Sequence, residues 1–322
     1  PETGPWPTED PFLFCVHHND NYPAAKDDLS PNVSLSGRHL GNDFSNKDGW
    51  SMYHGQKVPG FPRHPHRGFE TLTVVSKGFI DHADSLGASA RYGDGDAQWL
   101  TAGDGINHSE MFPLFSQNGN NKLDFFQIWL NLPSYNKRVE PNFEMYWEDE
   151  IPKISSNLNG NKNVQVEIIT GDYLDFSSPI APKNSWANNK KNDVAVWIIR
   201  LDSNGNFAIP NTKSGAKRNL YVLKGSNMEI DGQSISGGSM VTLDSSKNTV
   251  IKNLGSKTKI LMLQGVPINE PVVKYGPFVM NTRSEIEQAF YDYNRTEFGG
   301  WKWGNSDPVH GMEKEKFAKL IN

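Results

Sequence analysis

Cysteine is almost absent from this sequence. Cys15 is the single cysteine among 322 residues, so an internal disulfide is excluded. Disulfide frameworks are typical of secreted proteins, and the lack of one favours a reducing, cytoplasmic location. The sequence shows no charged and then apolar leader, which agrees with that expectation. Cys15 also has no neighbouring base in the sequence, so we do not expect a catalytic thiol.

Long apolar runs and dense positive charge are lacking as well. No stretch approaches the ~20 apolar residues that a membrane-spanning helix needs. The 32 Lys and Arg residues are outnumbered by 37 Asp and Glu residues, and the net charge is −5. These features argue against membrane insertion and against direct nucleic-acid binding. A chain of this length with 36% hydrophobic residues is typical of a globular protein with two domains.

Turn-forming residues are plentiful and separate many short strand-like segments. The chain has 29 glycines and 20 prolines, and β-branched or alternating apolar segments lie between them. A first set of strands is predicted at 71–76, 79–83, 98–101 and 124–130. A second set is predicted at 164–168, 194–201, 220–223, 228–230, 239–243, 249–251 and 260–263. We expect the domain boundary in the irregular stretch with Pro133, Pro141 and Pro152. The spacing of the second set suits a sandwich or small barrel.

One helix is predicted near the C-terminus. Thr282 and Glu285 have the spacing of a capping box. The following apolar residues fall on one helical face; they are Ile286, Ala289, Phe290 and Tyr293. An aromatic tail follows, and we expect it to pack back on a barrel because so many rings would not stay in water.

Histidine is concentrated in the first 108 residues of the chain, where eight of the nine histidines lie. His64-Pro65-His66 and His108-Ser109-Glu110 each place two potential metal ligands two residues apart. Side chains with this spacing share one face of a strand. Two such strands facing each other would bring three imidazoles and one carboxylate together, which suits a divalent transition metal. Pro65 favours an extended backbone and removes one backbone donor, so this segment suits a strand at a sheet edge or the mouth of a barrel.

Other polar residues near these pairs have different expected roles. His17 and His18 are adjacent, so they point to opposite faces of a strand and would be poor co-ligands. His82 and Asp84 are expected to form a hydrogen-bonded structural pair. Glu70 is either a further ligand or a structural carboxylate at the start of a strand.

Four protein ligands would leave up to two open positions on a six-coordinate metal, as a catalytic site requires. Mixed imidazole and carboxylate ligands suit Fe(II), and also Mn, Co, Ni, Cu or Zn. Four large side chains near the ligands would either line an apolar pocket or belong to the ordinary core; they are Phe61, Phe69, Trp99 and Met111.

Longer motifs surround the ligand pairs and extend into the second half. They lie at 58–71, 82–87, 95–103, 105–111, 126–133, 276–281 and 298–303. In these motifs the chain resembles the pirin family of the cupin superfamily. The N-terminal motifs are highly specific, and the second half matches mainly in its strand layout.

The resemblance implies an all-β bicupin with two stacked β-barrels and a short C-terminal helix. Residues 1–135 would form the metal-binding barrel and 136–270 a barrel without ligands, with 271–322 packing back as helix and tail. Pirins hold one mononuclear iron through three histidines and one glutamate. Carried onto this chain, those ligands are the four that spacing alone selects; they are His64, His66, His108 and Glu110.

The function implied by the resemblance is dioxygenation of a flavonol such as quercetin. The substrate would be a small aromatic hydroxy-carbonyl compound together with O2, and Glu110 would accept the hydroxyl proton. One alternative is an iron-dependent, redox-sensing regulator with a protein partner, and another is isomerisation of a small polar substrate. Residues 1–55 and 116–121 are longer than in the shortest members, which leaves the pocket shape open.

Overall fold

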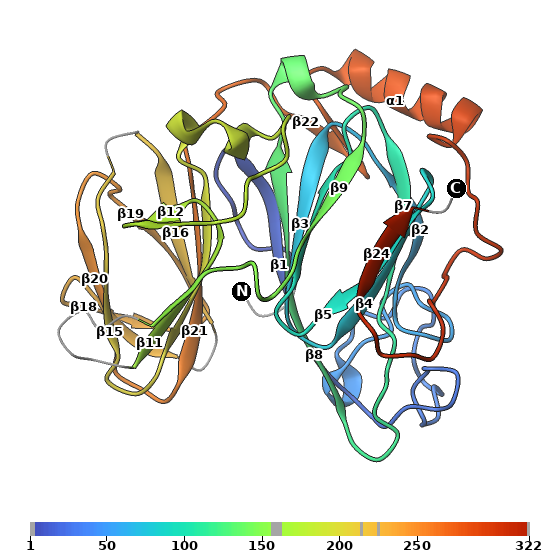
Figure 1. Cartoon of the computed structure of the whole chain (residues 1–322), viewed down its shortest axis with the longest axis horizontal. Coiled ribbons are helices and arrows are strands. Elements are labelled where there is room, and N and C mark those ends of the chain that lie inside the picture. Colours follow the sequence, from blue (N-terminus) through green and yellow to red (C-terminus); the bar gives the residue numbers. More distant parts are fainter. Residues whose placement is uncertain (1–3, 156–162, 213–214, 224–225, 321–322) are drawn as a thin grey trace. The chain divides into compact units, whose positions relative to one another are not determined.

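Antiparallel β-strands make up most of the regular secondary structure (Figure 1). The computed structural model describes residues 4–155, 163–212, 215–223 and 226–320. The described residues contain one α-helix, so the expected all-β class is confirmed. The chain forms two compact units. The first comprises Pro1–Val16, Ile128–Asn131 and Asp149–Asn269, and the second comprises His17–Gln127, Leu132–Glu148 and Glu270–Asn322.

Two five-stranded sheets form most of the second unit. The strand order in one is β1-β8-β3-β6-β9 and in the other β2-β7-β4-β5-β24. The first sheet contains β1 (Phe12–Tyr22), β8 (Asn121–Asn131), β3 (Phe69–Lys77), β6 (Ala97–Thr101) and β9 (Asn142–Tyr146). The second contains β2 (Gly60–His66), β7 (Ile106–Met111), β4 (Phe79–Asp84), β5 (Ala88–Gly93) and β24 (Phe317–Leu320). The strand β2, which carries Pro65, lies at a sheet edge, one of the two positions expected for it.

The first unit contains a six-stranded and a four-stranded sheet. The larger one, in spatial order, is β10 (Lys153–Ser155), β11 (Val164–Thr170), β14 (Ala195–Leu201), β21 (Thr258–Gly265), β16 (Lys217–Val222) and β19 (Ser239–Leu243). The smaller one is β15 (Asn206–Ile209), β20 (Thr249–Asn253), β17 (Asn227–Ile230) and β18 (Gln233–Ser236). A short hairpin of β12 (Asp172–Tyr173) and β13 (Phe176–Ser177) completes it.

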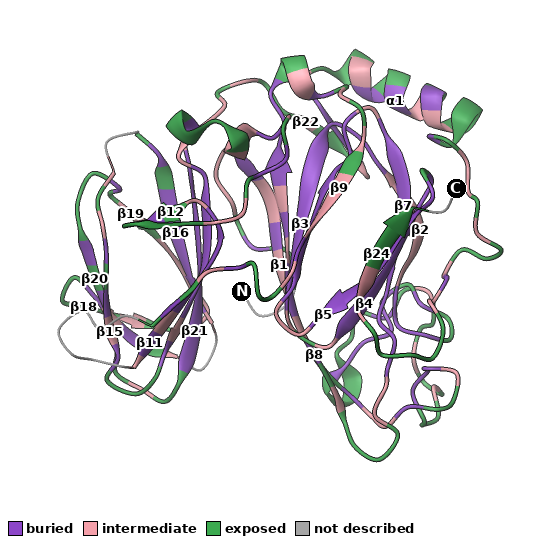
Figure 2. Ribbon diagram, viewed as in Figure 1, coloured by how far each residue is buried: buried purple, intermediate pink, exposed green. Residues whose placement is uncertain are grey.

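In β11, burial follows the alternation of apolar and polar residues in the sequence. In β11, Val164, Val166 and Ile168 are buried and the residues between them are half-buried. Such alternation is the signature of a strand with one face in the core. Figure 2 shows the buried positions concentrated in the strands. The first unit has a large cluster of buried apolar residues, and both units also bury polar residues in their sheets.

The C-terminal helix begins where the sequence predicted. The helix α1 (Arg283–Thr296) follows Thr282, whose side chain accepts from the Glu285 amide while the Glu285 carboxylate accepts from the Thr282 amide. This capping box satisfies two amides that helix geometry leaves unpaired. Ile286 and Ala289 pack beside the hairpin of β22 (Val273–Tyr275) and β23 (Phe278–Met280).

The tail after the helix pairs with a sheet of the same unit. The strand β24, drawn in red in Figure 1, runs antiparallel to β5 with Phe317 opposite Arg91. Arg91 forms a buried ion pair with Asp81 at 2.7 Å and also donates to the Gly311 carbonyl. Among the described residues, no helix is long and apolar enough to cross a membrane.

Candidate metal centre

Two neighbouring antiparallel strands carry the predicted ligands. His64 in β2 lies directly opposite His108 in β7, and Phe61 lies opposite Glu110. The spacing is three residues on one strand and two on the other, so β2 bulges between Phe61 and His64. A bulge re-aims the side chains of a strand, here the pair of histidines that follows it. At Gly60 (φ 140°) a Cβ atom would lie 2.5 Å from the Glu110 carbonyl oxygen, so only glycine allows this close approach.

The structure brings the three histidines together. One ring nitrogen from each of His64, His66 and His108 lies within 4.8 Å of the other two. The ring centroids are 4.4 Å apart for His64 and His108, and 5.0 Å apart for His66 and His108. His66 and His108 are buried, and His64 is half-buried. Three imidazoles converge here from two strands, as the spacing predicted.

Backbone carbonyls orient two of these imidazoles. The His64 Nδ1 atom lies 2.8 Å from the Pro62 carbonyl oxygen, and the His66 Nδ1 atom lies 3.3 Å from that of Pro277. Since a carbonyl oxygen only accepts hydrogen bonds, each Nδ1 carries the proton and each Nε2 carries the lone pair. Metal-binding histidines characteristically have their second nitrogen held in this way.

The third imidazole is buried without a hydrogen bond. Neither Nδ1 nor Nε2 of His108 has a partner within the described part of the chain. A buried polar atom left unpaired costs ~1–3 kcal/mol, so such atoms in a native structure require an explanation. A metal ion between the three rings would satisfy one His108 nitrogen. The donor set therefore fits a metal on chemical grounds.

Burial keeps the imidazoles neutral. Loss of solvation lowers the pKa of His64 to about 4, partly offset by the Pro62 carbonyl. Burial, reinforced by the neighbouring imidazoles, holds the pKa values of His66 and His108 well below their usual range. Neutral imidazole is the form that binds metals.

Glu110 lies next to this group but is engaged elsewhere. Its Oε1 atom accepts from the Thr73 hydroxyl at 3.2 Å, and its Oε2 atom accepts from the Gln127 amide at 2.7 Å. Burial raises the pKa of Glu110, while these two hydrogen bonds oppose the rise. The carboxylate is not among the converging donor atoms, and its role as fourth ligand stays a prediction.

Thr73 and Gln127 are functional candidates that the sequence analysis missed. They come from β3 and β8, far from Glu110 in sequence, and only the packing of the two sheets reveals them. Tyr92 donates to Gln98 at 3.4 Å, and burial together with the Glu110 charge raises the pKa of the Tyr92 hydroxyl. Inward-facing polar residues on alternating strand positions were the available signal.

The other polar residues discussed in the sequence form hydrogen bonds within the protein. His82 and Asp84 form the predicted structural pair at 3.0 Å. Adjacent His17 and His18 have different partners, as expected for opposite faces; these are Asp124 at 2.9 Å and Tyr53 at 2.8 Å. Glu70 accepts from Thr101 at 2.8 Å, and strand alternation places it on the face of β3 opposite Thr73. Burial raises the pKa of the Cys15 thiol, which disfavours the reactive thiolate.

Two of the four predicted pocket residues lie near the histidines, and the other two face away from the site. The Phe61 ring is 6.4 Å from His64, and the Phe69 ring is 5.0 Å from His66. Trp99 follows Gln98, the strand partner of Thr73, and Met111 follows Glu110. Alternation therefore places Trp99 and Met111 on the faces turned away from Thr73 and Glu110. The pocket remains a prediction, and it depends on Phe61 and Phe69.

Acidification is expected to destabilise the metal-free protein. Burial lowers the pKa of His18 to about 3 and that of His64 to about 4, against about 6.5 in the unfolded chain. The unfolded state therefore binds more protons, and stability is lost as pH falls below about 6.5. The expected loss is on the order of 1–3 kcal/mol per buried imidazole by pH 4.

Urea unfolding of metal-free protein at pH 7 and pH 5 measures this effect. The His108→Leu variant should show a shallower pH dependence because it has one fewer buried imidazole. The exposed His39 provides the control, and its replacement by alanine should leave the pH dependence unchanged. Equal unfolding free energies at both pH values would contradict the prediction.

Comparison with known proteins shows the family of the chain. The family model described as Pirin matches residues 8–130, and the Pirin C-terminal cupin domain matches 196–299. Human Pirin is 31% identical over 252 residues, which cover 77% of this chain and 80% of the relative. A pirin-like protein of Solanum lycopersicum is 34% identical over 237 residues, covering 73% and 75%.

A solved structure supports the same assignment. The crystal structure of quercetin 2,3-dioxygenase from Acinetobacter baumannii superposes with a TM-score of 0.70 at 28% identity. The match covers 90% of this chain and 86% of that one. The predicted resemblance, including the cupin-type second half, is thereby confirmed. The chain belongs to the pirin family.

Proposed function

We propose that this protein is a metal-dependent dioxygenase that opens the ring of a flavonol such as quercetin. The observation that carries the proposal is the convergence of three buried, neutral imidazoles, those of His64, His66 and His108. The similarity to a quercetin 2,3-dioxygenase supports the substrate class. Fe(II) is the proposed metal, and Mn, Co, Ni, Cu and Zn are the alternatives to be tested.

The three histidines would hold the metal, with Glu110 as the fourth ligand or as a base. A bound divalent metal supplies Lewis acidity, which lowers the pKa of a substrate hydroxyl and favours its anion. The Glu110 carboxylate accepts the hydroxyl proton. Burial raises the pKa of Glu110 and makes it a stronger base near neutral pH. Thr73 and Gln127 hold its two oxygens in place.

The substrate would present a hydroxyl beside a carbonyl to the histidines. Phe61 and Phe69 contact His64 and His66 and give this region an apolar, aromatic lining. Such a lining favours a flat aromatic compound and excludes water from the reacting atoms. A small, highly polar substrate would gain little from these contacts, which disfavours the isomerase alternative.

A reconstitution assay tests the proposal. Metal-free protein is loaded with each candidate metal and given quercetin under 18O2, with metal-free protein as the control. The expected result is loss of quercetin together with a ring-opened product that contains two 18O atoms. Absence of turnover with every metal would overturn the dioxygenase assignment. Product with one labelled atom or none would overturn the proposed reaction type.

A further inference from the structure

Three aromatic rings gather beside the half-buried histidine of the site. The Phe44 ring lies 5.1 Å from His54 and 6.4 Å from Phe61, and His54 lies 5.7 Å from Phe61. Phe44 is 48% exposed, His54 is exposed and Phe61 is half-buried. Single exposed apolar residues are common on protein surfaces, whereas a cluster of partly exposed rings marks a binding surface more specifically. We call these three residues the aromatic rim.

The aromatic rim adjoins the metal centre. Phe61 lies opposite Glu110 across β2 and β7, so both side chains lie on the same face of the sheet. The Phe61 ring is also 6.4 Å from His64, the one member of the histidine triad that is not fully buried. A molecule bound to the triad that extended toward solvent past His64 would meet these rings.

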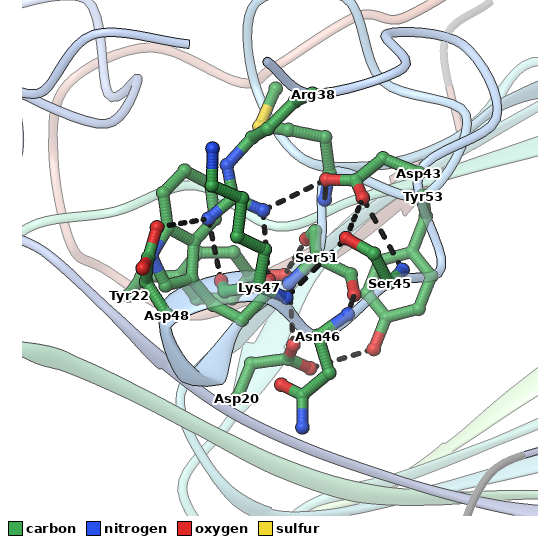
Figure 3. A network of polar contacts seen from close by, with 12 residues as sticks. Asp20, Tyr22, Arg38, Asp43, Ser45, Asn46, Lys47, Asp48, Ser51 and Tyr53 are labelled. Carbon is green, nitrogen blue, oxygen red and sulfur yellow. Dashed lines mark hydrogen bonds and ion pairs between the residues drawn. The ribbon is translucent and has the colours of Figure 1, made fainter. Parts of the chain in front are cut away.

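The backbone beneath Phe44 is firmly held. The adjacent Asp43 carboxylate accepts from Arg38 at 2.9 Å and from the Ser45 hydroxyl at 2.6 Å (Figure 3). It also accepts from the Met52 amide at 3.0 Å. Asp43 and Tyr53 also exchange two backbone hydrogen bonds, of 2.8 and 2.9 Å. Phe44 is therefore an exposed ring on a rigid support, which reduces the conformational entropy lost on binding.

Tyr53 fixes the other side of the aromatic rim. Its hydroxyl donates to Asp20 at 2.7 Å, as Figure 3 shows, and accepts from His18 at 2.8 Å. Its backbone has φ 55°, a conformation that costs a non-glycine residue free energy and persists only where surrounding contacts impose it. The Tyr53 ring packs 5.2 Å from Phe61 and 5.4 Å from Phe44. These buried contacts set the positions of two rings of the rim.

We propose that Phe44, His54 and Phe61 determine substrate specificity by binding the aromatic rings of the substrate that lie remote from its metal-chelating hydroxyl and carbonyl. This inference rests on the proposed function and adds the residues that select a large, multi-ring flavonol. A single-ring compound with the same chelating pair would reach the histidines without contacting Phe44. The rim thus separates two ligand classes that the metal centre alone would treat alike.

Equilibrium binding tests the inference independently of turnover. Metal-loaded protein is titrated without oxygen with quercetin and with 3-hydroxy-4-pyranone, a single-ring compound that carries the same hydroxyl and carbonyl. Phe44→Ala should weaken quercetin binding about threefold to tenfold, the range typical of one aromatic contact, and leave pyranone binding unchanged. Phe44→Trp should restore quercetin affinity. The control is Tyr135→Ala, which removes a 72% exposed ring of the same unit and should bind both ligands normally.

The outcomes separate the two proposals. Equal quercetin affinity in the wild-type and Phe44→Ala proteins would overturn the role of the rim and leave the dioxygenase proposal intact. An equal loss of affinity for both ligands would also overturn it, because the change would then act on the metal centre. Failure of the wild-type protein to bind quercetin, with pyranone still bound, would overturn both the rim and the flavonol assignment.

Discussion

Replacement of His108 by leucine is expected to abolish metal binding while stabilising the metal-free protein. His108 supplies one of the three converging ring nitrogens, so its loss leaves only two imidazoles. Changing a residue that merely supports a metal ligand typically costs about 10–100-fold in metal affinity or activity. Loss of a ligand itself should exceed that range, and turnover should fall with occupancy.

The same replacement is expected to raise the stability of the metal-free protein. Within the described chain, both nitrogens of His108 are buried without hydrogen bonds, and burial holds its pKa well below the usual range. Leucine fills a similar space without burying unpaired polar atoms. The metal-free variant should therefore unfold with a free energy about 1–3 kcal/mol higher than that of the metal-free wild type at pH 7.

Two measurements on the same samples check this prediction. Elemental analysis should fall from about one metal per chain to almost none, and urea unfolding should show the gain in stability. His39→Ala serves as the control for both, since His39 is exposed. Full metal occupancy in His108→Leu would remove this residue from the ligand set. A large loss of stability would show that the His108 ring supports the fold.

Local sequence patterns were sufficient to predict the parts of the site that depend on a single strand. The two-residue spacing of His64 and His66 placed both rings on one face, and the edge position of Pro65 follows from its missing amide hydrogen. The capping box at Thr282 likewise marked the start of the helix. Each of these features depends on neighbours within a few residues.

Features that depend on distant pairing were not predictable in this way. The bulge between Phe61 and His64 and the hydrogen bonds that Thr73 and Gln127 donate to Glu110 require the register of strands far apart in sequence. The strand β1 was missed because polar residues interrupt its apolar pattern. Two of these, His18 and Asp20, are buried and form hydrogen bonds to the Tyr53 hydroxyl, and Asp20 also accepts from the Ser51 amide. The predicted domain limits stay a prediction.

Glu110→Gln is expected to retain the metal and to lose turnover. The three imidazoles remain, and glutamine preserves the size of the side chain. Its single oxygen can accept from Gln127 while its NH2 group donates to the Thr73 hydroxyl, which reverses the present Thr73 hydrogen bond. An amide cannot accept the substrate proton. The loss of a general base typically lowers the rate about 10²- to 10⁴-fold, and we expect kcat to fall within that range.

The pH dependence distinguishes a base from a structural carboxylate. Burial raises the pKa of Glu110, so wild-type kcat should fall as pH decreases through that raised value, whereas the residual rate of Glu110→Gln should not. The stability of the metal-free protein depends on this group in the opposite direction from kcat. A raised carboxyl pKa contributes stability below the unfolded value of about 4.3, and this contribution is lost as pH rises through the folded value. The variant should lack this loss.

Glu70→Gln is the matched control. Like Glu110, Glu70 is buried and accepts from a threonine hydroxyl, that of Thr101. Unlike Glu110, it lies away from Thr73, on the opposite face of β3. The control variant should turn over quercetin at close to the wild-type rate. Full activity in Glu110→Gln would exclude the base role. Loss of metal in Glu110→Gln, with occupancy retained in Glu70→Gln, would instead support Glu110 as the fourth ligand, since a buried carboxylate on the other face of β3 would then be shown not to affect metal affinity.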